Sequence, residues 1–263
     1  ENFIWEFMQN HKTYEVHHWY NGNDQKADTA SWRSYNYVHV ANTYYNMYQI
    51  AKNYPNMSQY LTANAYLRRC YNTLKAYFTY PMFAGTEATK KPPMKPETSG
   101  AYVFGNMGEM NLPAILNALQ EEGYSEEYTY LSERIDEKVQ LLFKAQYPFA
   151  SEMSIDTTGF ESCYTLAKMK GLTDIVEKTT KASLACRGMQ PLWYFCGSDN
   201  RHMGESGWNL GYETQLGAWQ QQDYLYTYAD PSSADFDDIM RGTYSAYLAG
   251  WSNINVGQID HDP

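Results

Sequence analysis

The chain has 263 residues, which is enough to bury a sizeable core, and its 43% hydrophobic and 19% charged residues are ordinary for a globular protein. The formal net charge of −10 argues against nucleic acid as a partner, because nucleic-acid binding depends on Lys and Arg to neutralise phosphates. No apolar run in the sequence is long enough to span a membrane, so we expect no membrane partner.

Helical periodicity recurs along the chain in four successive pairs of segments. Within each segment the apolar residues follow the i, i+3, i+4, i+7 spacing of an amphipathic helix, and short loops with Gly or Pro separate the two members of most pairs. No segment has the alternating pattern of a convincing strand. The predicted helices cover about residues 36–52, 63–78, 108–120, 125–143, 159–170, 174–186, 208–228 and 236–251.

Two consecutive helices joined by a short loop form an α-hairpin, so the sequence predicts an all-α protein of repeated α-hairpins. Such hairpins coil into a solenoid or close into a toroid. No residue-level repeat is visible, and the connections are long and unequal. We therefore expect residues 1–263 to form a single (α/α) toroid domain, or part of one.

Aromatic residues are unusually frequent in this chain. The 26 Tyr, 7 Trp and 10 Phe make up 16% of the sequence. Tyr and Trp combine a flat apolar face with a polar edge, so they suit a core and also suit stacking against sugar rings. Most of them are expected to pack inside the protein, but an excess this large favours an aromatic-lined surface. Carbohydrate is the ligand class that fits best.

The segment "YPFASEMSIDTTGFESCY" (147–164) places three carboxylates at the start of a predicted helix. Thr158 and Glu161 have the spacing of a capping box, in which both side chains satisfy free N–H groups at the helix start. Capping explains these two residues without any function. Gly159 is a poor helix former inside this box, which indicates a close approach of another group to the backbone.

Capping does not explain the other carboxylates of this segment, Glu152 and Asp156. Glycoside cleavage in most families uses two carboxyl groups, one as acid and one as base or nucleophile. Glu152 and Asp156 could form this pair, or one of them could act with Glu205 from a later acidic and aromatic stretch. The first interpretation is therefore a glycoside hydrolase with Glu152, Asp156 and Glu205 as candidate catalytic residues.

Two further stretches supply candidate substrate-binding residues. One is "EVHHWYNGNDQKADTASWRSYNYVHV" and the other is "WYFCGSDNRHMGESGWNLGYE", and both mix aromatic with polar side chains. Neither the histidines nor the cysteines have a spacing typical of metal ligands, so no metal and no other cofactor is expected. The candidate substrate-binding residues are Trp19, Trp32, Tyr35, His39, Glu161, Trp193, His202 and Trp208.

Two alternatives to the hydrolase stay open. In a polysaccharide lyase, Tyr35 and His39 would act as acid and base while Arg33 neutralises a uronate, although the shortage of basic residues counts against an anionic substrate. In a non-catalytic glycan-binding or structural component, the aromatic residues would bind oligosaccharide without releasing product.

Of the four cysteines, Cys70 lies on an apolar helical stripe and is expected to be a buried thiol. Cys186 and Cys196 either form a disulfide or remain free.

The segments "SYNYVHVANTYYNMYQIAKNYP" and "YPFASEMSIDTTGFESCY" resemble parts of six-hairpin (α/α)-toroid glycosidase-like proteins. Among these proteins, the resemblance is nearest to an uncharacterised-domain family of secreted bacterial and fungal proteins. It implies a central carbohydrate-binding cavity and a secreted, periplasmic or cell-surface location. Glu152, Asp156 and Glu161 are positions of the shared pattern without assigned roles. A full toroid has six hairpins and four are counted, so further domains or subunits are expected to complete it.

Overall fold

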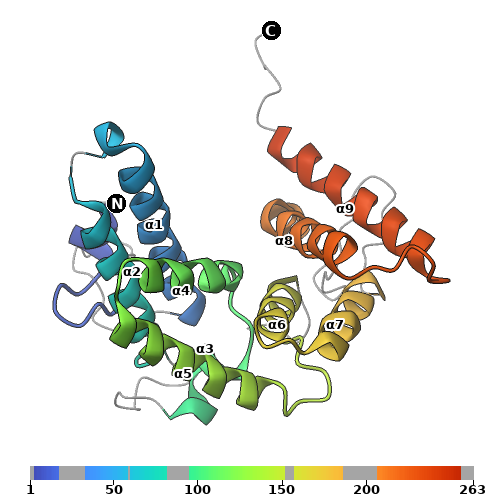
Figure 1. Cartoon of the computed structure of the whole chain (residues 1–263), viewed down its shortest axis with the longest axis horizontal. Helices are drawn as coiled ribbons and strands as arrows, with labels where there is room; N and C mark the ends of the chain where they lie inside the picture. Colours follow the sequence, from blue (N-terminus) through green and yellow to red (C-terminus); the bar gives the residue numbers. More distant parts are fainter. Residues whose placement is uncertain are drawn as a thin grey trace, which may run out of the picture. The chain divides into compact units, whose positions relative to one another are not determined.

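The computed structural model confirms the prediction of an all-α protein (Figure 1). Among the described residues all assigned elements are helices. An isolated β-bridge joins Gln9 to Val16. Among these residues, no helix is both long enough and apolar enough to cross a membrane. The structure describes residues 3–17, 33–58, 60–81, 95–151, 157–185 and 206–255, with the backbone alone at 157, 206–216 and 252–255.

The longer helices lie close to their predicted positions: α1 (Ser34–Asn53), α2 (Ala63–Tyr77), α4 (Leu112–Glu121), α5 (Ser125–Leu142), α6 (Thr157–Met169), α7 (Thr173–Ala185), α8 (Ser206–Thr227) and α9 (Phe236–Asn255). Short elements fill the connections: η1 (Ile4–Met8), η2 (Pro55–Met57), η3 (Pro96–Thr98), α3 (Gly100–Val103) and η4 (Glu109–Asn111).

The two largest differences from the predicted helix boundaries are at the end of α9, which lies at Asn255 and not at 251, and at the start of α4. The start of α4 was predicted at Gly108, but Gly108 has a φ of +89° and is followed by the 3₁₀ turn η4, so α4 begins at Leu112. A left-handed residue cannot continue an α-helix, and glycine adopts this conformation at little cost. Pro113 lies in the first turn of α4, where its missing N–H costs nothing.

The chain divides into two compact units, Glu1–Pro148 and Phe149–Pro263. In the first unit α1 packs on α2 and α4 packs on α5, and in the second unit α6 packs on α7 and α8 packs on α9. Each predicted hairpin is therefore formed (Figure 1). Within the units, α3 and α2 also contact α5, and α6 contacts α8. The single toroid domain stays a prediction.

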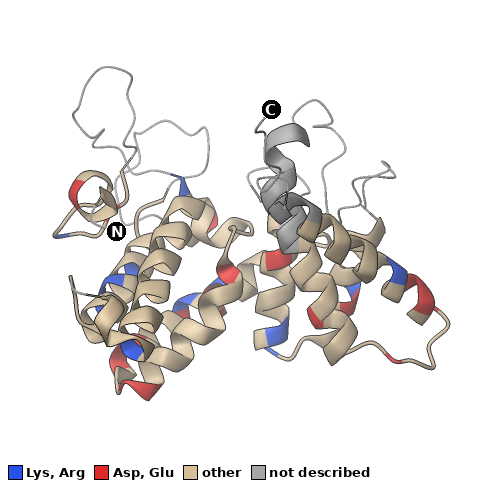
Figure 2. Cartoon of the chain, turned by 90° about the horizontal axis from the view of Figure 1, so that it is seen from above, with Lys and Arg blue, Asp and Glu red and all other residues tan. Residues whose placement is uncertain are grey.

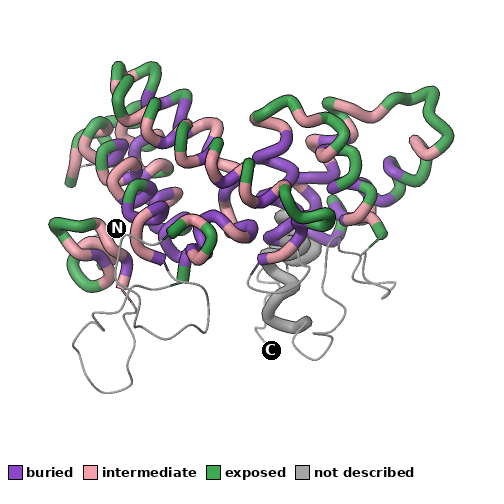
Figure 3. The backbone as a smooth tube through the Cα atoms, turned by 90° about the horizontal axis from the view of Figure 1, so that it is seen from below, coloured by how far each residue is buried: buried purple, intermediate pink, exposed green. Residues whose placement is uncertain are grey.

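Tyrosines are the commonest of the largest fully buried side chains in the first unit, and most of them belong to α1 and α2. Figure 3 shows how buried positions recur along these helices. Tyr44, Tyr48 and Tyr77 are each no more than 1% exposed. A buried hydroxyl is costly unless it is hydrogen-bonded, and each of these hydroxyls has a partner. Tyr44 donates to Gln9 Oε1 at 2.9 Å and Tyr48 donates to Glu122 Oε1 at 2.8 Å.

The prediction that Cys70 is a buried thiol is confirmed. Cys70 has no exposed surface, and burial raises the pKa of its thiol. Because the thiol therefore stays protonated and unreactive, the role of Cys70 is to pack in the interface of α1 and α2. Cys163 is likewise a buried free thiol, whereas Cys186 and Cys196 lie outside the described residues.

Within the second unit, polar contacts hold α6 and α8 together. Lys168 Nζ donates to both carboxylate oxygens of Asp223, at 2.9 and 2.6 Å, and the hydroxyl of Tyr164 donates to the same carboxylate. Burial, followed by the hydrogen bond to Asp223, raises the pKa of Tyr164. Trp219 packs edge-on against the ring of Tyr164 with centroids 5.8 Å apart. These contacts fix α8 against α6 along one side of each helix.

Candidate functional site

The predicted catalytic residues Glu152, Asp156 and Glu205 lie outside the described residues. Trp208 belongs to α8, but the structure describes its backbone alone. The roles of all these residues stay predictions. The substrate-binding candidates that also lie outside the described residues are Trp19, Trp32, Trp193 and His202.

The end of the carboxylate segment is tightly packed, as the glycine within it predicted. A Cβ atom at Gly159 would lie 2.1 Å from the carbonyl oxygen of Phe149, so the approaching group is the backbone of the chain itself. The ring of Phe149 stacks on that of Phe160 with centroids 4.7 Å apart. These contacts anchor the residues before the segment to the first turns of α6.

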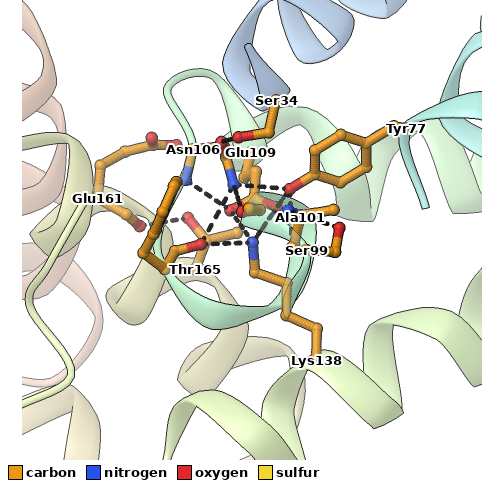
Figure 4. Close-up of polar contacts among 11 residues, drawn as sticks. Ser34, Tyr77, Ser99, Ala101, Asn106, Glu109, Lys138, Glu161 and Thr165 are labelled. Carbon is orange, nitrogen blue, oxygen red and sulfur yellow. Dashed lines mark hydrogen bonds and ion pairs between the residues drawn. The ribbon is translucent and has the colours of Figure 1, made fainter. Parts of the chain in front are cut away.

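The predicted capping box is not formed as expected. The helix α6 begins at Thr157, so Thr158 is its second residue and does not occupy the capping position before it. Glu161 is fully buried, which favours a structural role over contact with substrate. The backbone oxygen of Glu161 accepts a hydrogen bond from Thr165 Oγ1 at 2.9 Å (Figure 4). Its proposed contact with substrate stays a prediction.

Three predicted site residues come together at the start of α1. The guanidinium carbon of Arg33 lies 4.3 Å from the centroid of the Tyr35 ring, and Tyr35 meets His39 edge to face with ring centroids 5.6 Å apart. Tyr35 and His39 share a face of α1 because they are four residues apart. Arg33 and His39 are exposed and Tyr35 is half-buried, so this cluster is open to a ligand.

The electrostatics of this cluster favour a neutral imidazole. Desolvation of its ring lowers the pKa of His39 below the usual histidine value, although the residue as a whole is exposed. A histidine with a lowered pKa is unprotonated at neutral pH and can accept a proton. Arg33, which lies over the Tyr35 ring, supplies a positive charge to this cluster. Figure 2 shows that acidic and basic residues are interspersed along the described helices.

A buried polar network lies beneath the start of α1. The hydroxyl of Ser34, the first residue of α1, donates to Oδ1 of Asn106, and the side-chain amide of Asn106 donates to the Tyr77 hydroxyl at 2.8 Å (Figure 4). All three residues are at most 1% exposed. Because Ser34 stands between Arg33 and Tyr35, this network helps to set the direction in which α1 presents the cluster.

An ion pair without solvent exposure forms the centre of this network. Lys138 Nζ lies 2.7 and 2.9 Å from the two carboxylate oxygens of Glu109, and both side chains are 0% exposed. Glu109 also accepts from the Tyr77 hydroxyl at 2.9 Å and from the backbone N–H of Asn106 at 3.1 Å (Figure 4). Lys138 donates further to Phe104 O at 3.0 Å. Buried charges need such partners, and here both have them.

Lys138 is a residue that sequence analysis missed. The sequence could have revealed its burial through helical spacing. Leu131, Ile135 and Leu142 form the buried stripe of α5, and Lys138 occupies the position of that stripe between Ile135 and Leu142. A lysine at a core position indicates a buried acidic partner. The structure pairs Lys138 with Glu109.

The fold and the cluster together define an all-α protein of consecutive α-hairpins with acid and base side chains at the start of a helix. The chain belongs to DUF5695, a family of unknown function whose model matches residues 6–226. This agrees with the resemblance to an uncharacterised-domain family. Membership of the six-hairpin glycosidase-like superfamily stays a prediction.

One solved structure shares the fold of this chain. It is described as Polysaccharide Lyase BACCELL_00875, and it matches with a TM-score of 0.52 and 18% sequence identity over 92% of this chain. The match covers 32% of the lyase, so the chain spans about a third of its length. No curated protein matches the sequence significantly.

Proposed function

We propose that this protein acts on a polysaccharide and cleaves it by β-elimination next to a uronate. The observation that carries this proposal is the cluster of Arg33, Tyr35 and His39, which combines a cation, a phenol and a neutral imidazole at the start of α1. The likeness of the fold to a protein described as a polysaccharide lyase supports the same class of substrate. A secreted, periplasmic or cell-surface location is part of the proposal.

The proposed reaction assigns one task to each side chain. Arg33 pairs with the uronate carboxylate and stabilises the negative charge that builds up there as the C5–H bond breaks. His39 accepts the C5 proton as general base, and the hydroxyl of Tyr35 gives its proton to O4 as the C4–O4 bond breaks. The products are a C4=C5 double bond on one sugar and a free hydroxyl on the other. Proton transfer from His39 through water restores Tyr35.

A glycoside hydrolase is the second candidate function. It would use Glu152 with Asp156 or Glu205 as the carboxylate pair. The observation in its favour is the close packing of Gly159 against Phe149, which holds the start of the carboxylate segment against α6. Catalytic groups work best when rigid elements support them, so such anchoring suits an active-site segment.

Product analysis separates these functions. The wild type is expected to release unsaturated sugars, detected by ultraviolet absorbance, from at least one acidic member of a panel of neutral and acidic polysaccharides. His39→Gln should lower kcat by about 10²-fold or more, because it removes the general base. Tyr35→Phe should also lower kcat, and Arg33→Gln should raise KM and lower kcat. Tyr54→Phe is the control, because Tyr54 is an exposed tyrosine at the other end of α1.

The contrary outcomes are equally definite. Saturated products that disappear in Glu152→Gln or Asp156→Asn would overturn the lyase and establish the hydrolase. Unsaturated products that persist in His39→Gln would reject the assigned base. Glycan binding without any product would leave a non-catalytic glycan-binding protein.

The pH dependence follows from the lowered pKa of His39. As the pH rises through this pKa, the imidazole loses its proton and becomes able to act as the base, so kcat/KM should rise. Because the pKa is lowered, the midpoint of this acidic limb should lie below the usual histidine value of about 6.5. The measurement is kcat/KM between acidic and neutral pH, and a midpoint above that value would contradict the assignment of His39.

A further inference from the structure

An open groove of about 330 Å³ lies between α8 and α9 in the second unit. Its residues belong to the second unit, whereas the Arg33–Tyr35–His39 cluster belongs to the first unit. The volume falls at the lower end of the range of small-ligand sites. The groove is lined by Gln222 and Tyr226 from α8 and by Met240, Thr243, Tyr244 and Tyr247 from α9.

The aromatic residues of this groove are unusually open to solvent. Tyr226 is 85% exposed, Tyr244 is 61% exposed and Tyr247 is 40% exposed. Trp251, one helical turn beyond Tyr247 and 48% exposed, packs edge-on against Tyr247 with ring centroids 6.2 Å apart. Aromatic side chains therefore recur along α9 at intervals of about one turn, roughly 5.4 Å along the helix axis.

The polar groups of the groove are uncharged. Gln222 offers an amide, and Thr243 is a lining residue that is only 4% exposed. Thr243 Oγ1 donates to the backbone oxygen of Gln221 at 3.4 Å, which orients its hydroxyl. Among the described residues, none that lines the groove is charged. The first turn of α9 carries Asp237 and Asp238, and Arg241, next to Met240, lies 3.8 Å from Asp238, so the nearby charges do not sum to a positive patch. This charge pattern disfavours a polyanion.

We propose that this groove binds a neutral oligosaccharide. Sugar rings have C–H groups on their flat faces, which suit the faces of the Tyr226 and Tyr244 rings, and hydroxyls at their rims, which suit Gln222 and Thr243. This inference rests on the proposed function, because it takes from it that the ligand is a carbohydrate. It adds a second binding site, which holds a neutral part of the polymer while the cluster on α1 acts on the uronate.

Calorimetric titration with neutral hexasaccharides of β-1,4-linked glucose, mannose and xylose tests this inference. At least one should bind the wild-type chain, and the double variant Tyr226→Ala/Tyr244→Ala should bind it about tenfold more weakly, which corresponds to about 1.4 kcal/mol. Tyr244→Phe keeps the ring and should retain most of the binding. Tyr54→Ala is the matched control, because Tyr54 is 62% exposed and lies outside the groove. Circular dichroism verifies that each variant is folded.

Two results would overturn the inference. One is the failure of all three neutral hexasaccharides to bind, and the other is equal binding by the wild type and the double variant. If equal sugar binding is accompanied by loss of self-association in the double variant, the groove is a protein interface. Cleavage of an acidic polysaccharide by the double variant would leave the proposed function standing. Neutral-sugar binding by a chain that cleaves nothing would overturn only the proposed function.

Discussion

Replacement of Lys138 by Met is expected to lower the free energy of unfolding of the first unit by about 3–5 kcal/mol. The substitution removes the cation that lies 2.7 Å from the buried carboxylate of Glu109 (Figure 4). Methionine fills a similar volume, so most of the loss comes from the broken ion pair. The variant Glu109→Gln/Lys138→Met, which removes both charges, should recover part of the stability.

Native-state hydrogen exchange of the α5 amides measures this effect, because it reports the stability of the first unit even if the two units unfold separately. Lys181→Met is the control, and its effect is measured on the amides of α7 because Lys181 lies in the second unit. Lys181 is also paired, with Glu177 at 2.7 Å, but half of its side chain is exposed and solvent screens the pair. Equal losses in Lys138→Met and Lys181→Met would show that the buried pair contributes no more than a surface pair.

Replacement of Gly159 by Ala is expected to destabilise the second unit by about 3 kcal/mol or more, because the added Cβ overlaps a backbone atom that cannot easily move. That atom is the Phe149 carbonyl oxygen, 2.1 Å from the Cβ position. Helix propensity alone predicts the opposite sign, since Ala is about 1 kcal/mol more favourable than Gly inside a helix. The sign of the change therefore decides between local propensity and tertiary packing.

Hydrogen exchange in α6 and α7 measures this change. Gly171→Ala is the control in the same unit, because Gly171 has a φ of +66° and no atom lies within 4 Å of its added Cβ. It should cost only the roughly 1–2 kcal/mol of a left-handed residue. A stabilised Gly159→Ala variant would contradict the close packing of Phe149 on α6. If Glu152 and Asp156 are catalytic, Gly159→Ala should also reduce product release.

The helices could be predicted from the sequence because their signals are local. The spacing of apolar residues placed α1 and α2 within two residues of their observed ends. Gly123 and Gly171, which follow α4 and α6, have positive φ values. The start of α4 was predicted too early because the periodicity continues through the 3₁₀ turn. The capping box of α6 was misplaced because Thr157, one residue earlier, already belongs to the helix.

In the candidate site, contacts within one helix depend on local sequence, whereas contacts between elements depend on how those elements pack. Tyr35 and His39 lie together because a helix brings residues four apart to one face. Sequence analysis grouped them as an acid and a base, but it began the helix at residue 36 and so did not predict this contact. The pairing of Glu109 with Lys138 depends on how η4 packs against α5, which periodicity does not specify. The groove likewise depends on the register of α8 against α9.

The pairing of neighbouring helices also has a consequence for how the chain folds. Helices α1 and α2, α4 and α5, α6 and α7, and α8 and α9 pack as consecutive pairs, so many of the contacts join residues close in the sequence. Proteins rich in such local contacts fold rapidly. Each hairpin can therefore form soon after its second helix is synthesised, and the slower steps are those that join hairpins, such as the docking of α6 on α8.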